Sequence, residues 1–200
     1  MPAATTAAVT GLAPSSPRFH ERISRVALGD VIHRSARRFG ERTALIEGEH
    51  RLSYRALDAA SNRFAHHLLD LGLEKGERVG MLCNNSIQMV VAMLGIQKAG
   101  LVWVPINTAL GVEAIGYILS HAEVRHVVID TALHAKPELR ELLQATGVSP
   151  LLCVLDGDAP PPGIATVPQA IAQGPETLPD VAIDSADLAL IMYTSGTAGR

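Results

Sequence analysis

The sequence predicts an α/β fold in which helices flank a largely parallel sheet on both faces. Short apolar runs rich in β-branched residues alternate with segments whose apolar residues recur at helical spacing. Serines precede two of the helical segments, and glycines follow them. Because strands joined through helices run parallel with right-handed crossovers, this alternation predicts a parallel sheet. At 200 residues the chain is long enough to bury a core without disulfides or metals.

The predicted strands follow from short apolar runs bounded by turn residues. In chain order they are 43–47, 78–83, 101–106, 125–130, 151–155 and 188–193. The run 188–193 (LALIMY) is apolar throughout, which is typical of a buried strand.

Four helices are expected between these strands. The first begins after Ser53 and ends at Gly72, and the second begins after Ser86 and ends at Gly100. The second is apolar on nearly every side, which indicates burial. A third has its apolar face at 115, 118, 119 and 122. The fourth runs from Pro137 to Gly147, with proline suited to the first helical turn.

Composition and charge narrow the classes of function. Apolar residues make up 48% and charged residues 18%, and 17 lysines and arginines face 20 acidic residues for a net charge of −3. This weak negative charge argues against a nucleic-acid partner. Cys83 and Cys153 lie in apolar runs, which favours unpaired thiols and a reducing, cytoplasmic location. The uncharged stretch 79–97 is interrupted by Asn84 and Asn85, so a transmembrane segment is not expected.

Two stretches fall outside the alternating pattern. Residues 1–17 are rich in Ala, Thr, Ser and Pro and lack the basic start of a secretory signal, so a disordered leader is expected there. Residues 156–187 hold six prolines and six acidic residues but no lysine or arginine. They are expected to form a long surface connection with a short helix near 169–172.

The loop after the last predicted strand is the candidate functional site. Its glycines allow the backbone to approach a ligand closely, and successive amide groups with hydroxyl groups suit an anion. The candidate phosphate-binding residues are Thr194, Ser195, Gly196, Thr197 and Gly199. The alternative is a turn that only reverses the chain. Neither a Walker A loop nor a G-x-G-x-x-G motif is present.

Three segments in order resemble motifs of the adenylate-forming enzymes, which include acyl-CoA synthetases, peptide-synthetase adenylation domains and luciferases. Residues 193–200 (YTSGTAGR) are similar to the phosphate-binding motif of that family, 52–57 (LSYRAL) to its early helix start, and 98–107 (KAGLVWVPIN) to its K-A-G segment. The resemblance covers roughly residues 26–200. It implies that residues 18–200 are an incomplete AMP-binding domain, cut within the phosphate loop.

The resemblance also implies a reaction. Members of this family activate a carboxylic acid with ATP and Mg²⁺ to form an acyl-adenylate, which a thiol, usually coenzyme A, then converts to a thioester. Residues 194–197 and 199 would hold the ATP phosphates. Ala198 stands where the family usually has a hydroxyl residue. The later family residues, including the Pro and Lys after the loop, the magnesium-binding Glu and the catalytic Lys, are not in the 200 residues. No catalytic residue and no metal ligand is therefore assigned here, and these residues alone are expected to be inactive.

Two alternatives stay open on the sequence. The asparagine at 107 resembles the pattern of acyl-CoA ligases, whereas peptide-synthetase adenylation domains more often have Asp at this position. A non-catalytic nucleotide-binding or interaction module on the same scaffold belongs to a different class. Other polar residues are expected to be structural: the adjacent His66 and His67 are poorly placed to share a metal, and the arginines at 34, 37 and 38 suit a solvated helix face.

Overall fold

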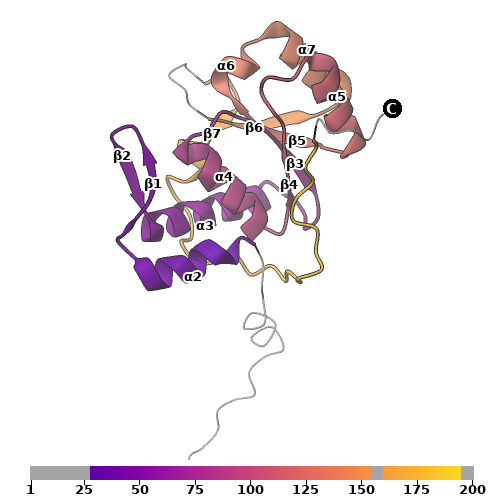
Figure 1. Cartoon of the computed structure of the whole chain (residues 1–200). Coiled ribbons are helices and arrows are strands. Elements are labelled where there is room, and N and C mark those ends of the chain that lie inside the picture. The colour runs from indigo at the N-terminus through magenta and orange to yellow at the C-terminus, as the bar shows by residue number, and fades with distance from the viewer. Residues whose placement is uncertain (1–27, 155–159, 195–200) are drawn as a thin grey trace, which may run out of the picture.

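The structure is a computed structural model that describes residues 28–154 and 160–194; the predicted leader, 1–17, lies outside them. Its centre is a five-stranded sheet of order β4-β3-β5-β6-β7 (Figure 1). The strands are β3 (Arg78–Leu82), β4 (Val102–Pro105), β5 (His126–Asp130), β6 (Ser149–Val154) and β7 (Ala165–Thr166). Every pairing in it is parallel. The predicted α/β fold is confirmed.

Helices cover both faces of the sheet and form a separate apolar core on each (Figure 1). One face carries α3 (Tyr54–Asp70), α4 (Ile87–Lys98) and α8 (Val167–Ala170). The other carries α5 (Val112–His121), α6 (Thr131–His134) and α7 (Pro137–Thr146). Outside the first layer, α2 (Asp30–Phe39) packs on α3. An antiparallel hairpin of β1 (Thr43–Glu47) and β2 (His50–Ser53) lies beside them.

Local capping chemistry sets the starts of α3 and α4. The Ser53 hydroxyl accepts from the backbone N–H of Ala56 at 3.2 Å, and that of Ser86 accepts from Met89 at 3.0 Å. The two helices approach closely at Gly95, where an added Cβ would lie 2.6 Å from Cδ1 of the buried Phe64. The nearly all-round apolar surface of α4 is therefore explained by its place between α3 and the sheet.

Three short elements, β2, β7 and α6, were not predicted, and one predicted helix begins earlier than expected. The four-residue β2, which is half-exposed, and the two-residue β7 carry no alternating apolar pattern, so the sequence did not predict them as strands. The helix expected near 169–172 is α8 at Val167–Ala170. A capping box between Thr166 and Gln169 fixes the earlier start, since each side chain bonds the backbone N–H of the other residue, at 3.3 and 2.8 Å.

The described part of the proline-rich connection lies along the surface of α3. Asn62 Nδ2 donates to the carbonyl oxygen of Glu176 at 2.5 Å, and His66 Nε2 lies 2.9 Å from that of Thr177. Farther on, Lys75 Nζ and Asp187 Oδ2 pair at 2.6 Å, and this hydrogen bond lowers the pKa of Asp187. These contacts guide the chain from α8 back across the molecule toward β4.

Residues 188–193 correct one expectation. The segment does pair in parallel with β4, because Trp103 N donates to Ala189 O and Ile191 N donates to Trp103 O, both at 3.1 Å. It is not buried, however: Leu188 is 53% and Met192 61% exposed. Within the described residues, the segment pairs with a strand, β4, along one edge only. A central strand is paired along both edges, so this segment is less covered than the sequence predicted.

Candidate functional site

The carboxyl edge of the sheet contains a topological switch point between β3 and β5. From β3 the chain passes through α4 to β4 on one side, and from β4 it passes through α5 to β5 on the other side of β3. The two connecting helices lie on opposite faces of the sheet. In open α/β sheets, ligands bind at the carboxyl ends of strands at such a point.

Three polar residues are joined by hydrogen bonds at this switch point. Asp130, the last residue of β5, is 1% exposed, and its Oδ2 accepts hydrogen bonds from Asn84 N at 2.7 Å and Asn84 Nδ2 at 2.8 Å. Thr108, after β4, donates to Asn84 Oδ1 at 3.3 Å. The turns after three neighbouring strands are thereby joined through the exposed Asn84. Their position directly after buried strands is a sequence signal that could have identified them.

We expect Asp130→Asn to lower the free energy of unfolding of the 200-residue chain by about 1 kcal/mol. Both bonds would then end on a neutral oxygen, and bonds to charged acceptors are stronger. Urea denaturation measures the change. Asp184→Asn is the matched control, because its carboxylate also accepts a backbone N–H at 2.8 Å but in an exposed turn. Equal, negligible shifts in both variants would contradict a special role for the buried carboxylate.

The segment beside β4 leads to Thr194, the first residue of the predicted phosphate loop, at this same edge. Leu190 pairs with Trp103 in parallel register, so the chain passes the end of β4 at Pro105 within two residues. Thr194 follows and is exposed. The other predicted phosphate-binding residues, Ser195, Gly196, Thr197 and Gly199, lie outside the described residues. The loop therefore starts at the carboxyl edge, where the fold places ligands.

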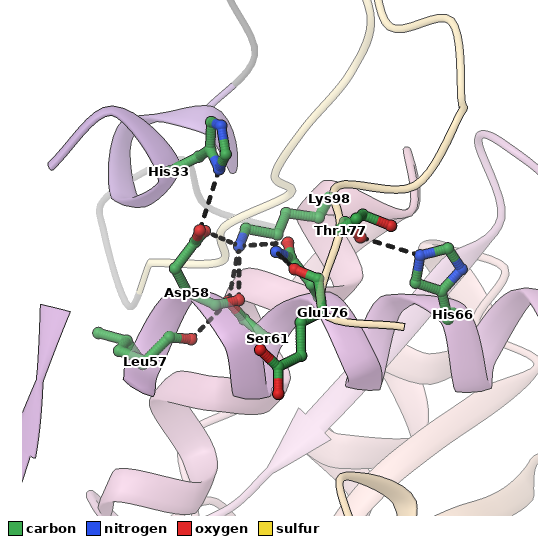
Figure 2. A network of polar contacts seen from close by, with 9 residues as sticks. His33, Leu57, Asp58, Ser61, His66, Lys98, Glu176 and Thr177 are labelled. Atoms are coloured by element: carbon green, nitrogen blue, oxygen red, sulfur yellow. Dashed lines mark hydrogen bonds and ion pairs between the residues drawn. The ribbon is translucent and has the colours of Figure 1, made fainter. Parts of the chain in front are cut away.

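Lys98 of the K-A-G segment is a buried residue whose role the sequence did not reveal. Its ammonium group is 0% exposed and lies 2.5 Å from Asp58 Oδ1, 2.8 Å from Ser61 Oγ and 2.7 Å from Asn62 Oδ1 (Figure 2). The second carboxylate oxygen of Asp58 lies 2.9 Å from His33 Nδ1. This network joins α2, α3 and the end of α4, so Lys98 holds these helices together.

The remaining polar residues occupy structural positions. His66 contacts a backbone carbonyl, whereas the pKa of His67 is lowered by burial. Cys83 is half-buried, and its thiol donates to the carbonyl oxygen of Val128 at 3.4 Å. Over residues 28–154 and 160–194, no three acidic, histidine or cysteine side chains gather as a metal site would require. Within the same ranges, no helix combines the length and hydropathy needed to cross a membrane.

The sheet order defines an open α/β sheet with a switch point at its carboxyl edge, the place where such sheets bind ligands. The family model of the AMP-binding enzymes matches residues 32–200, and the chain belongs to that family. The resemblance noted in the sequence is thereby confirmed.

Curated relatives include both CoA ligases and peptide synthetases. The chain is 35% identical over 174 residues to the N-(5-amino-5-carboxypentanoyl)-L-cysteinyl-D-valine synthase of Streptomyces clavuligerus, covering 86% of this chain and 21% of that protein. It is 36% identical over 163 residues to a medium/long-chain-fatty-acid–CoA/3-oxocholest-4-en-26-oate–CoA ligase of Mycobacterium tuberculosis (80% and 29%). A 3-hydroxybenzoate–CoA/4-hydroxybenzoate–CoA ligase of Thauera aromatica is 32% identical (92% and 35%). The chain thus spans about a third or less of these relatives.

Solved structures show the same fold. The anthranilate CoA ligase AuaEII in complex with anthranoyl-AMP superposes with a TM-score of 0.72 at 25% identity, over 90% of this chain and 34% of that one. MbtA of Mycobacterium smegmatis superposes with a TM-score of 0.73 at 25% identity, over 86% and 32%.

Proposed function

We propose that this chain forms the first part of an ATP-dependent acid–thiol ligase. In the first step, the carboxylate of the substrate attacks the α-phosphate of ATP, giving an acyl-adenylate and pyrophosphate. One observation supports the proposal: residues 188–193 run parallel to β4, and Thr194, where the candidate phosphate loop would begin, follows directly after them. Membership of the AMP-binding family supports the adenylating chemistry.

In this proposal Thr194, Ser195, Gly196, Thr197 and Gly199 hold the β- and γ-phosphates through backbone N–H groups and hydroxyls. Each hydrogen bond to a charged oxygen contributes about 1.5–3 kcal/mol, so four or five of them are enough to position a triphosphate. The loop orients the nucleotide and does not react with it, since the nucleophile belongs to the acid. Magnesium would enter with the nucleotide as Mg-ATP.

For the second step we propose transfer of the acyl group to coenzyme A. Asn107 favours this acceptor by its resemblance to acyl-CoA ligases, and two of the curated relatives above are CoA ligases. The 35% identity to a peptide synthase favours a second candidate, in which an adenylation domain passes the acyl group to a carrier-protein thiol. A non-catalytic nucleotide-binding module is the third candidate. We propose a cytoplasmic setting for any of them, in keeping with the two cysteines that lie in apolar runs of the sequence.

The test is pyrophosphate exchange into ATP, catalysed by the protein made from the full reading frame that encodes this chain, with a panel of carboxylic acids. We expect exchange that depends on the acid, followed by thioester formation with coenzyme A. The 200 residues alone should show no exchange. Exchange without a CoA thioester would favour the carrier-protein candidate. Absence of exchange with every acid, in a protein that still binds ATP, would favour the non-catalytic module.

A further inference from the structure

Three aromatic side chains from two distant parts of the chain meet beside the start of the loop. Tyr117 and His121, one turn apart at the end of α5, stack with ring centroids 5.3 Å apart. The ring of Tyr193 packs edge-on to both, at 6.3 Å from Tyr117 and 5.7 Å from His121. The Tyr193 hydroxyl also lies 2.6 Å from Nδ1 of His121. A stacked and hydrogen-bonded imidazole has a defined orientation, so the cluster forms a specific contact.

This contact matters because of where Tyr193 lies in the chain. Tyr193 directly precedes Thr194, the first residue of the candidate phosphate loop. Two residues earlier, Ile191 N bonds to Trp103 O and so ties the segment to the edge of the sheet. Met192, between these two points, is exposed, whereas the Tyr193 ring packs against the core that α5 and α7 form. The chain is therefore held from the sheet edge at Ile191 and from α5 at Tyr193.

We propose that His121, oriented by Tyr117, is a positioning residue that sets the start of the ATP phosphate loop through its hydrogen bond to Tyr193. The proposal rests on the proposed function for its ATP-dependent part only. A loop of small residues and glycines has many conformations, and fixing one end reduces the number that must be lost when phosphate binds. Residues that touch no substrate act in this way by preorganising those that do.

The chemistry of the pair suits a permanent contact. Burial, followed by the neighbouring Tyr117, raises the pKa of Tyr193 above its ordinary value, so the phenol keeps its proton at neutral pH. A neutral phenol donates to Nδ1 or accepts from it, so the bond forms with either tautomer of the imidazole. The bond therefore survives a change of tautomer.

Hydrogen–deuterium exchange tests the tether without reference to activity. In Tyr193→Phe and His121→Ala of the 200-residue chain, we expect the amides of 192–194 to exchange about 3 to 10 times faster, the effect of losing one such bond. His121→Asn, whose amide takes the place of Nδ1, should restore part of the protection. His66→Ala is the matched control, because it removes another histidine contact to the same connection, at Thr177. Unchanged exchange at 192–194 in Tyr193→Phe would overturn the proposal.

Kinetics of the full-reading-frame protein test the consequence for ATP. Both variants should raise KM for ATP about 3- to 10-fold with KM for the acid unchanged, and His66→Ala should change neither. If the residues act through one bond, the double variant Tyr193→Phe/His121→Ala should be no worse than either single variant. Faster amide exchange with an unchanged KM for ATP, or fully additive effects, would overturn the positioning role. Absence of ATP-dependent activity in the parent protein would refute the proposed function, while amide exchange would still decide the tether.

Discussion

Lys98→Met is expected to lower the free energy of unfolding of the 200-residue chain by about 3–5 kcal/mol, the cost of breaking a buried ion pair by removing one partner. Methionine fills nearly the same volume, so the loss comes from the network. The side chain of Asp58 is 13% exposed, and it would lose its closest positive partner, while Ser61 and Asn62 would each lose a hydrogen-bonding partner. Urea denaturation followed by far-UV circular dichroism gives the change.

The control for this variant is Lys75→Met. Lys75 also forms an ion pair at 2.6 Å, with Asp187, but its side chain is 40% exposed. Exposed pairs contribute little, so this variant should unfold nearly as the parent does. Adding Asp58→Asn to Lys98→Met should recover part of the loss, because it removes the unpaired charge. A loss no larger for Lys98→Met than for Lys75→Met would show that the buried charge is dispensable.

Thr194→Ala and Thr197→Ala, made in the full-reading-frame protein, are expected to lower kcat/KM for ATP. Each removes one hydroxyl that we place on a phosphate oxygen, and the loss of such a contact costs about 1–3 kcal/mol, or roughly 5- to 150-fold. Initial rates of acid-dependent pyrophosphate exchange at varied ATP concentration measure the effect.

Thr177→Ala controls for the loss of a threonine as such. Thr177 is exposed on the connection, and its contact with His66 uses the backbone carbonyl, which alanine retains. Its kcat/KM for ATP should equal that of the parent protein. Parent-like kinetics for Thr194→Ala and Thr197→Ala as well would show that neither hydroxyl touches phosphate, and the phosphate site would then have to lie elsewhere.

Local chemistry explains which elements could be predicted from the sequence. The starts of α3 and α4 follow from Ser53 and Ser86, whose hydroxyls cap backbone groups three residues later. The end of α7 follows from Gly147, which takes the left-handed conformation at φ 69°. Short β2 and β7 could not be predicted, since their pairing partners and not their own patterns make them strands.

In the candidate site, too, some features follow from the local sequence and others only from the tertiary structure. By its own pattern the sequence determined the parallel α/β fold, the order of its elements and the composition of the candidate phosphate loop, because caps, glycines and apolar spacing act over a few residues. Only the tertiary structure paired Asp130 with Asn84 across 46 residues, Lys98 with Asp58 across 40 and His121 with Tyr193 across 72. Such contacts depend on which strand ends and helix faces become neighbours, and the sheet order, which places β3 between β4 and β5, decides that.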